Sequence, residues 1–228
     1  MNYKWLIFDA DNTLFDYDKS EEGALAASCQ EFNLPCHPEM AAAYREINSH
    51  IWRLFELGEI DIPTLRLRRF ELLFERFGES VPADAFSESY LKNLGNQVHL
   101  IDHALEVVKT VNQTHKLALI TNGISSVQRS RLSQSPLQQY FPIVIISDEI
   151  GASKPDPAIF EAAFEQMDQP KKTDVLMIGD SLTSDMAGAN NSGIDSCWFN
   201  PDHAIPDQDI RLDYEIESLK DLIGIVWY

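Results

Sequence analysis

Four short segments of the sequence carry side chains that could act on a charged group. The first is residues 9–13 (DADNT), in which two carboxylates stand two positions apart. Two crowded carboxylates repel each other and are stabilised by a cation, a proton or both. The spacing alone says little, because Asp16/Asp18 and Asp207/Asp209 share it. An acidic turn that caps a strand is the alternative interpretation.

The other three segments each have a chemical and a structural interpretation. Thr121, in Thr-Asn-Gly, offers a hydroxyl before main-chain N–H groups that could bind an anion, although this tripeptide is also an ordinary turn. Lys154 could neutralise a phosphate or be a solvated loop lysine. Asp180 and Asp185 could hold a hard divalent cation such as Mg²⁺, or cap a helix and compensate its dipole.

Apolar runs that come before these residues in the sequence predict the elements that position them. Four runs are typical of buried parallel strands, and a fifth is weaker. The runs cover Tyr3–Phe8, Leu117–Ile120, Ile143–Ile146, Val175–Ile178 and, weakest, Ser196–Phe199. Helical patterns follow over Ser125–Ser133, Pro157–Met167 and Thr183–Asn191. The alternation predicts an α/β, Rossmann-like core whose parallel strands bring all four segments to one edge of the sheet.

The long interval after the first strand has a different pattern. It is rich in Ala, Glu, Leu, Arg and Phe, with apolar residues at helical spacing, as in Ile47, Ile51 and Leu54. We expect about four helices there, forming an inserted helical cap over residues 16–98. The α/β catalytic core would then comprise residues 1–15 and 99–228. Its end is predicted to be a polar loop at Pro201–Asp209, a strand near Tyr214–Ile216 and a helix near Leu219–Ile225.

Composition excludes several function classes. Lys and Arg total 18 against 36 Asp and Glu, giving a formal charge of −18 that repels nucleic acids and anionic membranes. No apolar run approaches the roughly 20 residues that cross a bilayer, and Asp9 interrupts the first run before a secretory signal could form. The cysteines, Cys29, Cys36 and Cys197, lack CxxC spacing and predict free thiols. We therefore expect a cytoplasmic protein with no nucleic-acid or membrane partner, its oligomeric state open.

The four segments, in this order, resemble the haloacid dehalogenase superfamily of phosphohydrolases. The resemblance covers the whole chain, with matches at residues 9–13, Thr121, Lys154 and residues 179–185, and with the insert resembling the family's helical cap. More narrowly, FDADNTLF, ITNG followed by VQRSRL, and CWFN before an Asp-His pair are similar to bacterial pyrimidine-type 5′-nucleotidases. Those enzymes hydrolyse nucleoside monophosphates.

The resemblance implies a catalytic role for each matching residue. Asp9 corresponds to the nucleophile that becomes an aspartyl phosphate. Asp11 corresponds to the general acid that protonates the leaving oxygen and then activates water. Thr121 and Lys154, with Asn122 beside them, correspond to the groups that bind the phosphoryl oxygens. A small phosphate monoester is the implied substrate.

The resemblance also implies a cofactor. Asp9, the main-chain carbonyl of Asp11 and Asp180 correspond to ligands of Mg²⁺, and Asp185 to a further ligand or an acid behind them. Mn²⁺ is the alternative cation. The physical chemistry agrees, because a carboxylate attacking a phosphate dianion needs nearby positive charge, which a divalent ion and Lys154 would supply.

Cap residues are the candidates for recognising the leaving group, because a closing cap excludes water and commits the substrate. Trp52 could stack on a base, and Arg69 could meet a ribose or phosphate oxygen. Asn48 in the cap and Phe15, just after the first motif, are further candidates. The alternative for Trp52 is a core position, since it falls in a stripe with Ile51 and Leu54.

Other functions stay open from the sequence. A phosphatase for phosphoglycolate or a sugar phosphate, or a phosphoglucomutase-like enzyme, would share the core motifs and differ in the cap. An inactive scaffold used for binding is disfavoured because all the catalytic side chains are present. A dehalogenase is disfavoured by Asp11, since the dehalogenases of the superfamily lack an acid there.

Overall fold

A computed structural model of the protein describes residues 3–206 and 210–227. The chain divides into two compact units. The first, which we call the core, contains the residues up to Tyr17, His99–Ser125 and the residues from Leu132 onward. The second, the cap, contains Asp18–Val98 together with Ser126–Arg131. Of the predicted loop at Pro201–Asp209, positions 207–209 lie outside the described residues.

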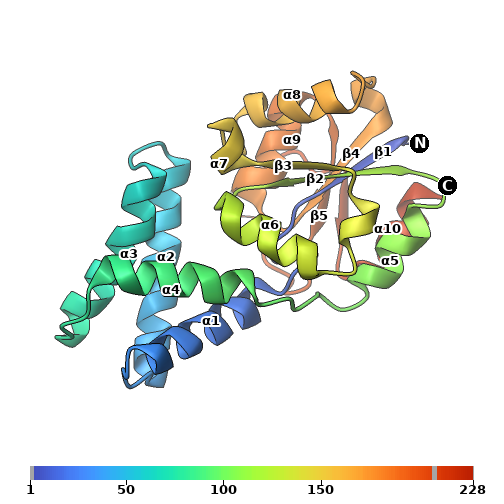
Figure 1. The fold of residues 1–228 in the computed structure, drawn as a ribbon. Coiled ribbons are helices and arrows are strands. Elements are labelled where there is room, and N and C mark those ends of the chain that lie inside the picture. Colours follow the sequence, from blue (N-terminus) through green and yellow to red (C-terminus); the bar gives the residue numbers. More distant parts are fainter. Residues whose placement is uncertain (1–2, 207–209, 228) are drawn as a thin grey trace. The chain divides into compact units, whose positions relative to one another are not determined.

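The core is built on one six-stranded parallel sheet with the order β3-β2-β1-β4-β5-β6 (Figure 1). The strands are β1 (Trp5–Phe8), β2 (Lys116–Thr121), β3 (Ile143–Ile146), β4 (Val175–Gly179), β5 (Asp195–Phe199) and β6 (Tyr214–Ile216). β1 lies between β2 and β4, so that Phe8 pairs with Leu119 on one side and Ile178 on the other. The predicted α/β fold with a parallel sheet is confirmed.

Alternation along the strands sends side chains to both faces of the sheet. Ile7, Ile120 and Met177 join a buried cluster with helices α8 (Pro157–Gln166) and α9 (Ala187–Ser192). Helices α5 (Ala104–Val111) and α10 (Asp221–Val226) lie on the other face (Figure 1). Because helices cover both faces of the sheet, the sequences of its strands are nearly continuous apolar runs.

Two local features differ from the sequence prediction. Helix α5 was not predicted, although Val107, Val108 and Val111 form its buried stripe. The helix expected over Thr183–Asn191 begins instead as a π-helical turn, η3 (Leu182–Met186), and only then continues as α9. Thr121 is the last residue of β2, which agrees with its predicted place at the carboxyl end of a strand. The remaining elements of this part are η1 (Gln138–Tyr140), α7 (Ser147–Ile150) and η2 (Lys172–Asp174). Helix α6 (Ser125–Gln134) is shared between the units, since its residues Ser126–Arg131 belong to the cap.

The inserted segment between β1 and α5 contains four helices, the number expected from the sequence. They are α1 (Tyr17–Glu31), α2 (Pro38–Glu56), α3 (Ile62–Phe77) and α4 (Ala83–Gly95). Asp61 caps α3 by accepting a hydrogen bond from the Thr64 N–H at 2.9 Å, and Gly78, with φ of 68°, ends it in the left-handed conformation. The buried ring of Phe70 lies 5.1–5.4 Å from the ring centroids of three neighbours, Tyr44, Phe86 and Tyr90.

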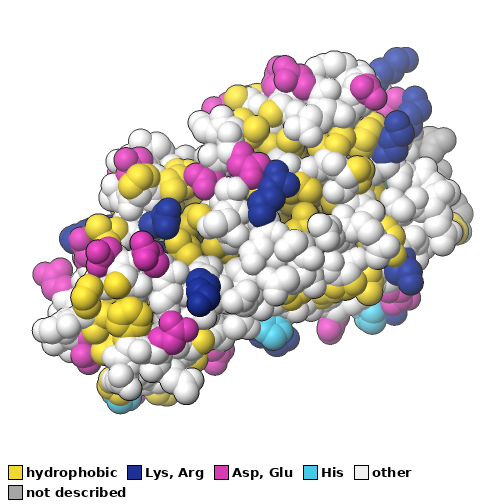
Figure 2. Space-filling view, in the orientation of Figure 1, with side chains coloured by type: hydrophobic (Ala, Val, Ile, Leu, Met, Phe, Trp, Pro, Cys, Tyr) yellow, Lys and Arg dark blue, Asp and Glu magenta, His cyan; other side chains and the backbone are white. Residues whose placement is uncertain are grey.

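Figure 2 shows Asp and Glu side chains spread over the drawn face rather than gathered into one patch. Among the described residues, no helix is both long and apolar enough to cross a bilayer. All three cysteines are free thiols.

Candidate active site

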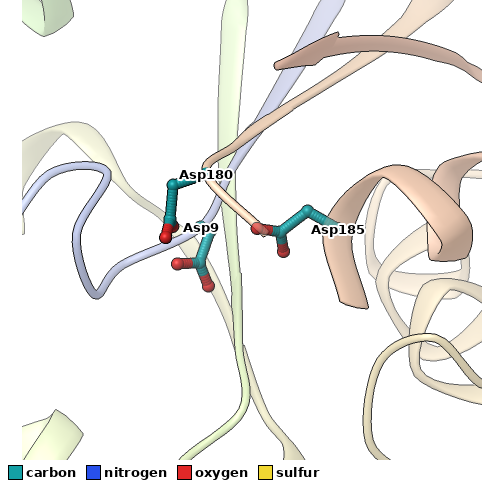
Figure 3. A group of neighbouring side chains, drawn as sticks. All are labelled: Asp9, Asp180 and Asp185. Atoms are coloured by element: carbon teal, nitrogen blue, oxygen red, sulfur yellow. The ribbon is translucent and has the colours of Figure 1, made fainter. Parts of the chain in front are cut away.

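Three acidic side chains converge at the carboxyl end of the central strands. Asp9 extends β1, its N–H donating to the Ile178 carbonyl at 2.9 Å, while Asp180 directly follows β4. Asp185 comes from the π-helical turn that follows. One carboxylate oxygen from each residue lies within 4.8 Å of the others, and Figure 3 shows the three side chains reaching toward a common region.

The approach of Asp185 depends on the residue before Asp180. A Cβ on Gly179 would lie only 2.2 Å from Asp185 Oδ2, so no side chain fits there. The same oxygen accepts a hydrogen bond from the Ser181 N–H at 3.0 Å. Glycine therefore allows the carboxylate of Asp185 to reach the cluster, and the Ser181 amide fixes its orientation.

Two contacts to Asp180 come from elsewhere in the core. Thr13 Oγ1 donates to Asp180 Oδ1 at 3.0 Å, which links the first motif to the last. Trp198 Nε1 donates to the Asp180 main-chain oxygen at 2.8 Å. Sequence reasoning missed Trp198 as a supporting residue, because its only signal was a place in the apolar run of β5.

Asp11 lies on the tight turn that follows Asp9. Asn12 there has a left-handed φ of 58°, and its N–H donates to the Phe15 carbonyl at 2.7 Å. Asp11 is half-buried, and the cluster of three carboxylates does not include its side chain. Phe15 is buried in the core beside this turn, with 1% of its surface exposed. The acid–base role of Asp11 and the substrate contact of Phe15 stay predictions.

Lys154 is buried among the acids. Its Nζ contacts Asp9 Oδ1 and donates to Asp185 Oδ1 at 2.6 Å and to the Ile120 carbonyl at 3.0 Å. Burial alone would lower the pKa of Lys154, but the negative charges of Asp185 and Asp9 outweigh it and raise that pKa. Lys154 is therefore an ammonium ion held at the carboxylate of Asp9.

Burial and crowding disfavour ionisation of the acids. Loss of hydration raises the pKa of Asp9 well above its usual range; Lys154 opposes this rise, whereas Asp185 and Asp180 add to it. Burial first, and then the charge of Asp185, raise the pKa of Asp180 to about 7. A cation among these oxygens would relieve the repulsion, so the donor set fits a hard divalent ion.

Thr121 has a buried hydroxyl that lacks a hydrogen-bond partner in the described part of the chain. The residue is fully buried at the end of β2, the strand next to β1. A buried hydroxyl left unpaired costs about 1–3 kcal/mol, so a ligand oxygen that paired with it would recover that energy. The neighbouring Asn122 turns its amide toward the main chain of Lys154.

The structure brings two of the cap candidates together. Arg69 Nη1 donates to Asn48 Oδ1 at 2.9 Å, and both side chains are buried. Glu21, which sequence reasoning missed, accepts a hydrogen bond from Asn48 Nδ2 at 2.7 Å, and burial raises its pKa. Trp52 is half-buried and packs edge-on against Phe55, with 5.7 Å between ring centroids. The substrate contacts predicted for Asn48, Trp52 and Arg69 stay predictions.

Several known proteins are similar to this chain over nearly its whole length. The profile of the haloacid dehalogenase-like hydrolases matches residues 6–199. The pyrimidine 5′-nucleotidase PynA of Streptococcus pneumoniae is 35% identical over 98% of this chain and 94% of its own, and the pyrimidine 5′-nucleotidase YjjG of Escherichia coli is 31% identical over 97% of each. The crystal structure of the magnesium-bound HAD-hydrolase YfnB from Bacillus subtilis matches with a TM-score of 0.94 and 33% identity over 99% of both chains.

The family match includes the four segments that the sheet brings to one edge. It also includes the buried acids of Figure 3 and the lysine between them. The chain therefore belongs to the haloacid dehalogenase-like hydrolases, and its acidic cluster is that of a phosphohydrolase.

Proposed function

We propose that the protein is a Mg²⁺-dependent phosphomonoesterase that hydrolyses nucleoside 5′-monophosphates through an aspartyl phosphate on Asp9. The observation that carries the phosphomonoesterase is the buried contact between Asp9 and Lys154 beside two further acids. The nucleotide as substrate is supported by PynA and YjjG, two pyrimidine 5′-nucleotidases that are similar over nearly their full length.

Asp9, Asp180 and the main-chain carbonyl of Asp11 would hold the Mg²⁺ ion, with Asp185 as a further ligand or behind them. The ion, when bound, supplies positive charge against the transferring phosphoryl group. The related YfnB was crystallised with magnesium, which supports this choice over Mn²⁺.

The chain's own residues would carry out two substitutions at phosphorus. In the first, a carboxylate oxygen of Asp9 bonds to phosphorus while the bond from phosphorus to the nucleoside oxygen breaks, and Asp11 protonates that leaving oxygen. In the second, Asp11 takes a proton from water, whose oxygen attacks phosphorus and displaces the Asp9 carboxylate. The products are the nucleoside and inorganic phosphate, and both acids return to their starting states.

Lys154 and Thr121 would stabilise the phosphoryl group during both steps. Opposite unit charges about 4 Å apart gain about 4 kcal/mol at an effective dielectric constant near 20, so the ammonium of Lys154 offsets much of the repulsion between Asp9 and the phosphate. The Thr121 hydroxyl can donate to a phosphoryl oxygen without breaking a hydrogen bond to any described residue.

A substrate panel tests the proposal. In Mg²⁺ buffer, we expect kcat/KM for pyrimidine and purine nucleoside 5′-monophosphates to exceed that for glucose 6-phosphate and phosphoglycolate by about 10-fold or more. The measurement is release of inorganic phosphate. Asp9→Asn should lose activity by on the order of 10³-fold or more because the nucleophile is gone.

Two outcomes would contradict the proposal at different levels. A preference for sugar phosphates or phosphoglycolate would overturn the nucleotide as substrate but keep the phosphomonoesterase. Failure to hydrolyse any phosphate monoester, an aryl phosphate included, or activity that survives a chelator, would overturn the phosphomonoesterase itself.

Mg²⁺ should stabilise the folded protein through the acidic cluster. At 100 times its Kd, a ligand contributes about 2.7 kcal/mol, which corresponds to a rise in Tm of about 5–10 °C for a chain of this size. We expect thermal unfolding to show this rise in the unmodified protein and to lose most of it in Asp180→Asn. The matched control is Asp202→Asn, which removes the same charge at an exposed position; an equal loss in both variants would argue against the site.

The Mg²⁺ effect should also depend on pH. Asp180 has a pKa raised from 3.8 to about 7, so without a cation its buried site contributes stability that is present at low pH and is lost as pH rises through 7. Mg²⁺ competes with that proton. We therefore expect the Mg²⁺-induced rise in Tm to be larger at pH 8 than at pH 6. Equal rises at the two pH values would mean that no proton on Asp180 competes with Mg²⁺ in this range.

Thr121→Val should separate activity from stability. Valine keeps the branched shape and removes a hydroxyl that lacks a described partner, so we expect Tm to be unchanged or higher. Activity should fall by about 10²-fold, as for loss of one donor to a developing oxyanion. The control is Thr110→Val, whose hydroxyl donates to the Glu106 carbonyl away from the acids. A Thr121→Val enzyme with full activity would rule out the phosphoryl contact.

A further inference from the structure

One side-chain amide holds both main-chain polar groups of Lys154. Asn122 Oδ1 accepts a hydrogen bond from the Lys154 N–H at 2.8 Å, and Asn122 Nδ2 donates to the Lys154 carbonyl at 2.9 Å. Two hydrogen bonds from the planar amide of Asn122 fix both the position and the orientation of the Lys154 backbone. Asn122 comes from the end of β2, 32 positions away in sequence.

The side chain of Lys154 is anchored to the same strand. Its Nζ donates to the carbonyl of Ile120 at 3.0 Å, two residues before Asn122. The backbone and the ammonium of Lys154 are thus both tied to the end of β2, and the flexible chain between them is buried. Holding a lysine side chain in one place costs rotamer entropy. Because two anchors at the end of one strand already restrict Lys154, this entropy is lost before substrate binds.

We propose that Asn122 is a positioning residue that sets the place of the Lys154 ammonium against the phosphoryl group, rather than a residue that binds substrate itself. The inference rests on the proposed phosphomonoesterase. It changes the role expected from the sequence, where Asn122 stood among the substrate-binding residues. The amide uses one acceptor position and one donor on Lys154, and acts on the reaction through that residue.

A neighbouring contact provides a matched control. The Gly123 N–H donates to Ser147 Oγ at 3.0 Å, which joins the segment after β2 to the start of α7. Ser147 is buried like the groups around Lys154, but in the described part of the chain its hydroxyl pairs with the main chain of Gly123 and not with Lys154. Ser147→Ala therefore removes a contact of the same loop without releasing the lysine.

A double-mutant cycle tests the proposal. The proteins are the unmodified chain, Asn122→Ala, Lys154→Ala, the double variant and Ser147→Ala. The readouts are kcat/KM for an aryl phosphate in Mg²⁺ buffer, the inhibition constant of inorganic phosphate, and Tm. Lys154→Ala should retain measurable activity, reduced by about 10²–10³-fold.

Asn122→Ala should lower kcat/KM by on the order of 10–100-fold and weaken inhibition by phosphate, because a displaced ammonium no longer meets the phosphoryl group. In the Lys154→Ala background the same change should cost less than about 3-fold, since the group it positions is gone. Ser147→Ala should lower Tm and leave kcat/KM and phosphate inhibition within about 3-fold of the unmodified protein. Should Asn122→Ala fail to fold, Asn122→Asp keeps the acceptor, loses the donor to the Lys154 carbonyl, and should show the same dependence on Lys154.

Losses of equal size in both backgrounds would overturn the proposal, because Asn122 would then act independently of Lys154. Unchanged activity in Asn122→Ala, or an equal loss in Ser147→Ala, would overturn it as well. An unmodified protein that hydrolyses no phosphate monoester would instead overturn the proposed function on which the inference rests, so the two failures are distinguishable.

Discussion

Buried negative charge is the constraint on which the active site depends. Asp9, Asp180 and Asp185 share one site, and Lys154 supplies a single positive charge to it. If all three acids ionised, three negative charges against one positive would leave two uncompensated, and a buried uncompensated ion costs several kcal/mol. Without a cation, protons remove this charge, which is the physical meaning of the raised pKa values of Asp9 and Asp180. A divalent cation balances the same two charges and leaves Asp9 ionised, as a nucleophile must be.

The strand order makes this concentration of charge possible. Asp9 ends the strand between β2 and β4, so residues at the ends of both neighbours lie beside it. β4 contributes Asp180, and β2 contributes Thr121 together with the Ile120 carbonyl that holds Lys154. Parallel strands covered on both faces present their polar residues only where they end, which is why ligands gather at that edge.

Much of this arrangement could be predicted from sequence because each strand is an apolar run followed at once by a polar residue. Position along a strand is a local property, and it was enough to group Asp9, Thr121 and Asp180, whereas Lys154 lies beyond both β3 and α7. The π-helical turn before α9 was not predictable, because five residues are too few to separate helical periods. The contact of Trp198 with the Asp180 carbonyl was not predictable either, since a buried aromatic in an apolar run gives no sign of which atom its N–H meets.

Pairing between distant polar residues also limits what sequence says about the cap. Glu21, Asn48 and Arg69 form a chain of buried hydrogen bonds, and the Arg69 guanidinium lies 5.0 Å from the ring centroids of Phe70 and Tyr90. The spacing of these residues in the sequence does not predict these hydrogen bonds. If Asn48 or Arg69 turned toward a ligand, the buried hydrogen bonds of this chain would break. A buried charge would then be left unpaired, at a cost of about 3–5 kcal/mol.

Within residues 3–206 and 210–227, no hydrogen bond holds the Trp52 side chain in this way. It lies one helical turn from Asn48 on α2, it is half-buried, and its contact with Phe55 is edge-on. A base can therefore stack on the indole without breaking a buried polar bond. Among the three cap residues predicted to meet substrate, Trp52 is therefore the one whose contact with a nucleobase would break no buried polar bond, whereas Asn48 and Arg69 already serve, with Glu21, to link α1, α2 and α3 by hydrogen bonds.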